Sequence, residues 1–139
     1  MKRCISLIAI LIALSLSAAC WFKVSTHRYD EERVDSYAAT DHFVSLFNDR
    51  KFEEIYEMTH ERAKATKSKT ALINMLSSLR EGRGKIVDLE RADSSATPGD
   101  GLIEVTLQFK VNFERGENHL TLVWYVANRS AKLFSLALE

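Results

Sequence analysis

The sequence predicts an α+β domain in which three N-terminal helices precede a curved four-stranded antiparallel meander, with an export segment in front of both. Three observations lead to this prediction. A short basic head and an apolar run open the chain, apolar residues recur at helical spacing over residues 37–79, and apolar and polar residues alternate over residues 102–113. A chain of 139 residues is long enough for one domain with one core.

Composition narrows the class of protein before any motif is considered. The chain holds 19 basic and 19 acidic residues, and two of the basic ones, Lys2 and Arg3, lie in the export segment. Nucleic acid is therefore not an expected partner, because phosphate binding needs an excess of Lys and Arg. A hydrophobic fraction of 46% with a single Pro predicts a folded body. Both cysteines, Cys4 and Cys20, precede that body, so no disulfide framework is expected.

The N-terminus has the three parts of a secretory signal. Residues 1–3 form a basic head, residues 5–16 are apolar, and residues 17–19 are small. Cys20 follows directly. This arrangement resembles the lipobox of bacterial lipoproteins, although Ser17 stands where that family usually has Leu. The resemblance implies that a signal peptide, residues 1–19, is removed and that Cys20 carries lipid, which anchors the protein to a membrane of the cell envelope.

The alternative for this segment is an uncleaved anchor in the inner membrane. No charge occurs over residues 4–22, and about 20 apolar residues can span a bilayer. In the lipoproteins of Gram-negative cells, an Asp after the lipidated cysteine retains the protein in the inner membrane, and Trp21 occupies that position here. The resemblance therefore implies the outer membrane, facing the periplasm, if the cell is Gram-negative.

A polar tether and a first helix are expected next. Residues 20–35 include a charge-mixed stretch without an apolar period, and they predict a lipid-anchored tether in front of a domain that occupies residues 36–139. Asp35 or Ser36 can cap the first helix. Asn48 is expected to end that helix in a left-handed conformation, and Asp49 to cap the helix that follows.

Two more helices complete the front half of the predicted domain. One lies near residues 50–58 and places three apolar or aromatic side chains on one side, Phe52, Ile55 and Tyr56. Residues 59–67 predict a loop or a single turn. Ser68 then precedes an amphipathic helix, which Gly82 and Gly84 bring to an end.

Four strands joined by short turns follow the glycines, which requires an antiparallel meander. The first is expected over residues 85–92, with Val87 and Leu89 on its apolar face, and residues 94–101 predict a loop. The remaining apolar faces hold residues that recur at every second position: Ile103, Val105, Leu107, Phe109, Val111 and Phe113, then Leu120, Leu122, Trp124 and Val126, then Phe134, Leu136 and Leu138. Turns are expected at residues 114–117 and 128–130.

Three helices followed by such a meander resemble the nuclear transport factor 2-like superfamily, whose domains are cone-shaped α+β rolls. The resemblance covers residues 36–139 and rests on the order of the elements, on the junction at residues 48–52 and on the long strand at residues 102–113. Small bacterial lipoproteins with domains of this kind, many of unknown function, are similar. The resemblance implies a fold, and it implies little about activity.

Enzymes of this superfamily, such as the ketosteroid isomerases, need a carboxylate inside the cone. The alternation directs no acidic side chain inward from the sheet, although the phase of the first strand leaves Asp88 open. We therefore expect no catalytic residues. Glu53, Glu54 and Glu57 share a helix face opposite Phe52, which indicates a solvated flank.

The residues that could line a pocket are Tyr56, Phe109 and Trp124. Tyr56 is the polar side chain on a helix that best reaches the cone, and Trp124 could form an aromatic wall for an apolar ligand. Core packing is the competing interpretation for both. The four histidines lack the spacing of metal ligands, and we expect neither a metal nor a cofactor.

Three hypotheses for function remain open on the sequence. The first is a non-catalytic envelope module that binds a protein partner or a small apolar ligand. The second is a small isomerase-like or hydrolase-like enzyme of the same fold, and the third is a purely structural lipoprotein. Thr121, Val123 and Tyr125, beside Gln108 and Lys110, form a mixed polar face through which two sheets could pair in a homodimer.

Overall fold

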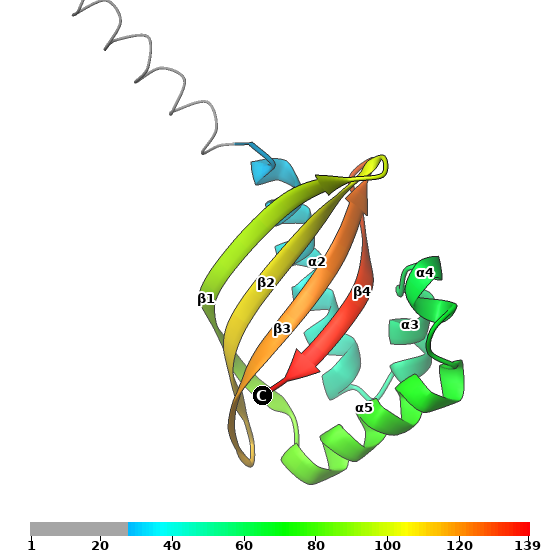
Figure 1. Cartoon of the computed structure of the whole chain (residues 1–139). Coiled ribbons are helices and arrows are strands. Elements are labelled where there is room, and N and C mark those ends of the chain that lie inside the picture. Colours follow the sequence, from blue (N-terminus) through cyan, green and yellow to red (C-terminus); the bar gives the residue numbers. More distant parts are fainter. Residues whose placement is uncertain (1–27) are drawn as a thin grey trace, which may run out of the picture. The chain divides into compact units, whose positions relative to one another are not determined.

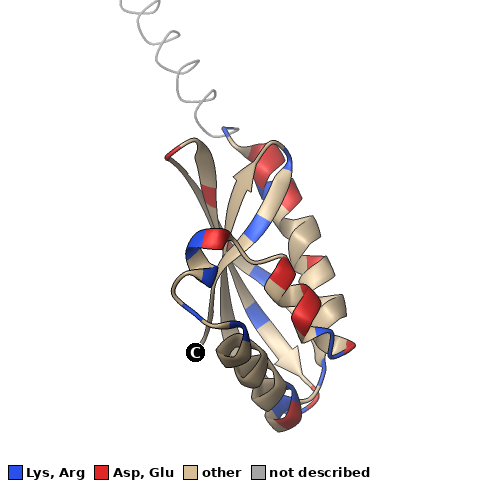
Figure 2. Cartoon of the chain, turned by 90° about the vertical axis from the view of Figure 1, so that its right-hand side faces the viewer, with Lys and Arg blue, Asp and Glu red and all other residues tan. Residues whose placement is uncertain are grey.

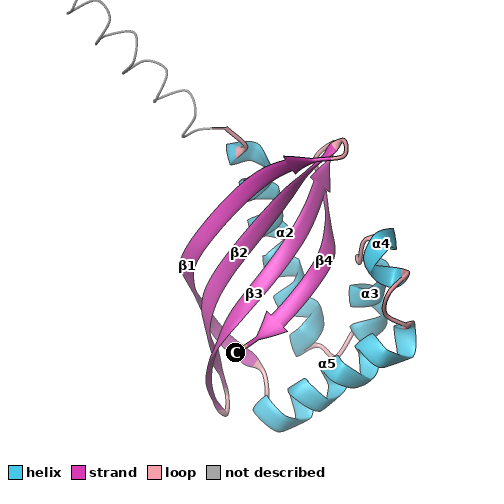
Figure 3. Cartoon of the chain, in the orientation of Figure 1, coloured by secondary structure: helices cyan, strands magenta, loops and turns pink. Residues whose placement is uncertain are grey.

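A computed structural model describes residues 28–139 of the chain. Helices come first and strands second, as Figures 1 and 3 show. The elements are α2 (Asp30–Asn48), α3 (Phe52–Glu57), α4 (Glu61–Lys64), α5 (Lys69–Arg83), β1 (Ile86–Gly99), β2 (Leu102–Phe113), β3 (Gly116–Ala127) and β4 (Ser130–Leu138). The strands pair in the order β1-β2-β3-β4, all antiparallel. The prediction of an α+β domain with an antiparallel meander is confirmed.

The core lies between the sheet and α2, which crosses behind the strands in Figure 1. Alternate residues of β2 and β3 are buried as predicted, and Val105, Val111 and Trp124 are 0% exposed. Ring contacts join the two layers: Tyr37 on α2 meets Phe109 edge-on at 6.2 Å. A register slip of one residue would expose this whole set of side chains, so the register of β2 and β3 is firmly determined.

α2 begins earlier than the sequence predicts, because residues 30–35 are helical and not part of a tether. Ser36 does not cap the helix. It is buried within it, and its hydroxyl donates to the Glu32 carbonyl at 2.8 Å. Contacts from another part of the chain explain the extra turns: Arg129, in the β3–β4 turn, pairs with Glu31 at 2.8 Å and with Asp35 at 2.8 Å. The spacing of apolar residues along α2 does not indicate these partners.

The junction between α2 and α3 differs from the prediction in its details. Arg50, with φ of +61°, takes the left-handed conformation that was expected of Asn48. Lys51, not Asp49, is the N-cap of α3, and its side chain makes no capping hydrogen bond. Asn48 still ends α2, but its side chain bonds to β1.

The remaining helices agree with the sequence. A single turn, α4, lies within the segment that predicted a loop or a turn. The Ser68 hydroxyl caps α5 by accepting from the Ala71 N–H at 3.2 Å. Gly84 ends α5 with φ of +83°.

β1 is longer than predicted, and its phase differs at its first residues, whereas Leu89 packs against the core as predicted. Residues 94–99 pair with β2 up to Gly99, so the predicted loop is wrong, and the turn is confined to Asp100 and Gly101. A bulge between Ile86 and Asp88 turns Val87 outward, where it is 68% exposed, and Ile86 takes the buried position. Backbone pairing with β2 holds the second half of β1 in place although its side chains are polar, which the residue pattern could not indicate.

β4 contains a second bulge that overturns one predicted core residue. Trp124 pairs with Leu133 and Val123 pairs with Ser135, which leaves Phe134 as the extra residue. Leu133 is therefore buried at 3% exposure, and Phe134 instead stacks on Tyr125. Leu136 and Leu138 remain half-buried against the core, as predicted. The turn before β4 has positive φ at both Asn128 and Arg129, the conformation that suits a two-residue hairpin.

Candidate functional site

The three side chains predicted to line a pocket do not lie together. Tyr56, on α3, lines a cleft beside β4. Phe109 and Trp124 lie in the core at 3% and 0% exposure, and neither lines this cleft. The lipidation residue, Cys20, lies outside the described residues. Of the three predicted pocket residues, only Tyr56 lines the cleft, and Phe109 and Trp124 belong to the core.

Large side chains occupy the centre of the domain, and the polar groups of Trp124 and Thr40 within it are hydrogen-bonded. The Trp124 indole N–H donates to the Thr40 hydroxyl at 3.1 Å, and that hydroxyl donates to the Ser36 carbonyl at 2.9 Å. Phe43 and Phe47 stack beside them with their ring centroids 6.2 Å apart. A buried polar chain of this kind gives α2 a defined position on the sheet.

Acidic side chains do not face this centre from the sheet. Asp88 and Glu90 are exposed on β1. Glu104 accepts a hydrogen bond from Tyr125 on the polar face, and burial together with this nearby carboxylate raises the pKa of the Tyr125 hydroxyl. Within residues 28–139, no three His, Cys, Asp or Glu side chains are arranged to hold a metal ion.

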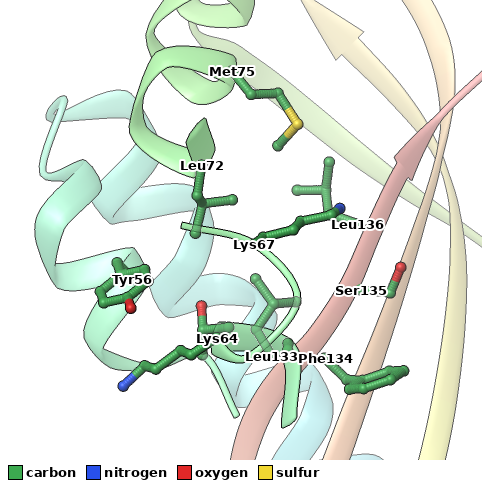
Figure 4. A pocket seen from close by; sticks show the side chains of 11 residues that line it. Tyr56, Lys64, Lys67, Leu72, Met75, Leu133, Phe134, Ser135 and Leu136 are labelled. Carbon is green, nitrogen blue, oxygen red and sulfur yellow. The ribbon is translucent and has the colours of Figure 1, made fainter. Parts of the chain in front are cut away.

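The cleft beside β4 has a volume of about 30 Å³, enough for one or two water molecules. Figure 4 shows its walls: Leu72 and Met75 come from α5, Tyr56 from α3, and Leu133 and Leu136 from β4. Polar atoms are contributed by the remaining lining residues, among them Thr59, Lys64, Lys67 and Ser135. The cleft is too small for a drug-sized ligand, which needs on the order of 300 Å³.

Thr59 and Leu133, which line the cleft, form a short backbone bridge between the helices and β4. Thr59 pairs with Leu133 in parallel orientation. The Leu133 N–H donates to the Met58 carbonyl at 3.0 Å, and the His60 N–H donates to the Leu133 carbonyl at 2.7 Å. The chain then turns away into α4, with the His60 ring accepting from the Arg62 N–H at 3.2 Å. The edge of β4 is therefore covered at Leu133.

The lysines around the cleft differ in their partners. Lys64 donates to Glu61 at 3.1 Å, and this hydrogen bond, together with the charges of Glu61 and Glu57, raises the pKa of the Lys64 ammonium. Lys69 pairs with Glu53 at 3.4 Å. Lys67 is exposed and makes no ion pair within residues 28–139. Elsewhere on the side that carries α4, Lys and Arg are interspersed with Asp and Glu, as Figure 2 shows.

The polar face that could form a homodimer is partly covered within the chain. Phe134 stacks on Tyr125 with the ring centroids 4.2 Å apart, and His60 meets the same ring edge-on at 4.9 Å. Tyr125 is consequently half-buried. Pairing of two sheets through this face stays a prediction.

The sequence analysis did not predict the contacts that join the C-terminal end of α2 to β1 and α5. The Asn48 amide donates to the Ile86 carbonyl at 2.9 Å, and its oxygen accepts from the Ile86 N–H at 2.8 Å. Arg80, only 8% exposed, donates to the Asn48 carbonyl at 3.4 Å. The spacing of Leu72, Leu76 and Arg80 along α5 was a signal that Arg80 shares the buried face.

The class of protein that these features define is a small α+β domain whose core holds large buried side chains and which has a small cleft beside β4. No protein-family profile matches the chain. No curated protein sequence matches it significantly. Within residues 28–139, no helix is both long enough and apolar enough to cross a membrane.

Proposed function

We propose that this protein is a lipid-anchored cell-envelope protein whose domain is a non-catalytic, protein-binding module of the nuclear transport factor 2-like class. The observation that carries the anchor is the sequence of residues 1–20, in which Cys20 directly follows an apolar run and three small residues. Acyl chains contribute about 0.8 kcal/mol per buried methylene, so more than one chain holds a protein stably at a membrane. Helices in front of a four-stranded meander support the assignment to this class of fold.

The filled interior favours protein binding over catalysis or capture of a small ligand inside the cone. Trp124, Phe43 and Phe47 occupy the space between α2 and the sheet, at exposures of 1% or less. A ketosteroid isomerase-like reaction needs a carboxylate and a substrate in that space. Exposed edges and faces are then the surfaces through which the domain acts.

Mass spectrometry of the mature N-terminus tests the anchor. We expect the chain isolated from bacterial membranes to begin at Cys20 and to carry the mass of a diacylglyceryl group with or without an additional acyl chain. The variant Cys20→Ser should retain residues 1–19 and lack lipid. A mature chain that still begins at Met1, or one that begins at Cys20 without lipid, would contradict the proposal.

A structural lipoprotein without a partner is the second candidate, and the same filled interior favours it. Crosslinking in intact cells separates the two. A binding module gives a defined crosslinked species with a partner protein, whereas a purely structural protein gives none.

A further inference from the structure

One stretch of sheet edge on this domain is unpaired next to the cleft. Glu139 exchanges two backbone hydrogen bonds with His119, each of 2.9 Å. In an antiparallel ladder such pairs alternate along the strand, so Ala137 also bonds toward β3. Leu136 and Leu138 therefore direct their N–H and C=O groups away from the sheet. Within the described part of the chain, no backbone partner meets them.

The same edge of β4 is already paired with another segment of the chain at Leu133, N-terminal to the unpaired residues. Thr59 pairs with Leu133 in line with the unpaired groups, and the chain leaves the edge where α4 begins. The position beyond His60 is thus a continuation of an existing strand line. Antiparallel or parallel addition of an extended peptide to such an edge is a general mode of peptide recognition.

The surroundings of this edge determine which peptide fits. Met75, 37% exposed, and half-buried Leu136 offer apolar surface at the cleft. Figure 4 shows the Lys67 amine directed toward β4 beside Leu136. Two lysines line the cleft, Lys64 and Lys67. Lys64 is paired with carboxylates, whereas Lys67 has no carboxylate partner among residues 28–139. The complementary group on a guest is a carboxylate.

We propose that the edge of β4 at Leu136 and Leu138 binds an extended segment of a partner protein that carries a small apolar side chain and an acidic residue. The small side chain enters the cleft, the backbone pairs with Leu136 and Leu138, and the carboxylate lies at Lys67. The inference rests on the proposed binding function and specifies its partner as an acidic, strand-forming segment.

Amide hydrogen exchange of the full chain in detergent micelles, followed by NMR, tests this proposal. The probe is a short synthetic peptide of alternating valine and threonine that ends in two glutamates, and the control peptide ends in two lysines. In the free protein, the Leu133 amide should exchange slowly because it donates to Met58, and the Leu136 and Leu138 amides should exchange fast. Excess acidic peptide should slow exchange at Leu136 and Leu138 and leave Leu133 unchanged.

Charge-reversal variants test the role of Lys67. We expect Lys67→Glu to weaken binding of the acidic peptide by about tenfold, the order expected when an exposed attraction becomes a repulsion. Lys51→Glu makes the same change of charge on an exposed lysine that does not line the cleft, and it should bind like the wild type. Equal binding of both peptides, or equal effects of both variants, would overturn the acidic preference.

Two further results would overturn the docking site itself. The first is fast exchange at Leu136 and Leu138 at saturating peptide. The second is protection of both amides from exchange in the absence of peptide, with a degree of protection that increases with protein concentration. This result would assign the edge to a second copy of the chain. Neither result bears on lipid at Cys20, whose mass is measured on the same sample, so failure of the docking site and failure of the anchor are distinguishable.

Discussion

Replacing Asn48 tests the most specific tertiary contact of this fold. The Asn48→Ala variant removes both hydrogen bonds to the Ile86 backbone, of 2.8 and 2.9 Å. Ile86 itself is only 7% exposed. Each buried backbone group left without a partner costs about 1–3 kcal/mol, and partial access of water offsets part of that cost. We therefore expect the free energy of unfolding to fall by about 2–4 kcal/mol.

Equilibrium unfolding in urea, followed by far-UV circular dichroism, measures this loss. The midpoint should fall while the slope with denaturant stays unchanged, because the surface exposed on unfolding is the same. Asn74→Ala provides the control, since Asn74 is exposed on α5 and its replacement should raise the free energy of unfolding by no more than about 0.7 kcal/mol through helix propensity. A loss below about 0.5 kcal/mol in Asn48→Ala would refute the reasoning.

The variant Asn48→Asp gives the same contact a pH signature. A carboxylate still accepts from the Ile86 N–H, but it opposes the Ile86 carbonyl, to which the amide donates in the wild type. Protonation restores a donor, so the folded state raises the pKa of this carboxyl, and the stability of the variant relative to the wild type should rise as the pH falls toward about 4 and level off below it. A pH-independent difference between the two proteins would contradict this assignment of the two bonds.

Further predictions concern glycine, charge and packing. Gly84→Ala should destabilise the protein by about 1–3 kcal/mol, because φ is +83° and an added Cβ would collide with the Glu114 side chain. At Gly82 an added Cβ contacts no other atom, so Gly82→Ala should stabilise the protein by about 0.5–1 kcal/mol in the same urea assay. The Lys85 N–H lowers the pKa of the Glu114 carboxyl from its ordinary 4.5, so its contribution to stability is present above that pH and is lost as the pH falls through the lowered pKa. The stability difference between wild type and Glu114→Gln should accordingly shrink below pH 4.5, and a constant difference would disprove the linkage. Trp124→Phe and Thr40→Val should show a coupling energy of about 1 kcal/mol in a double-mutant cycle, with strictly additive effects as the contrary result.

The sequence alone determined the elements whose side chains alternate or recur without interruption. β2 was predicted with its observed bounds, because one face of it is buried along its whole length and a slip of one residue would expose that face. The start of α5 after Ser68 and its end at Gly84 were also predicted, since both depend on local backbone chemistry. The signal segment and Cys20 are likewise visible in the sequence, and they remain predictions.

Tertiary structure decided the positions that depend on partners far along the chain. The first turns of α2 form with Arg129, and the second half of β1 is a strand because β2 pairs with it. The bulge in β4 exchanges Leu133 for Phe134 in the core. It also helps to place an unpaired edge beside the cleft, so the candidate site is built from contacts between α3, α5 and β4 that no local pattern encodes.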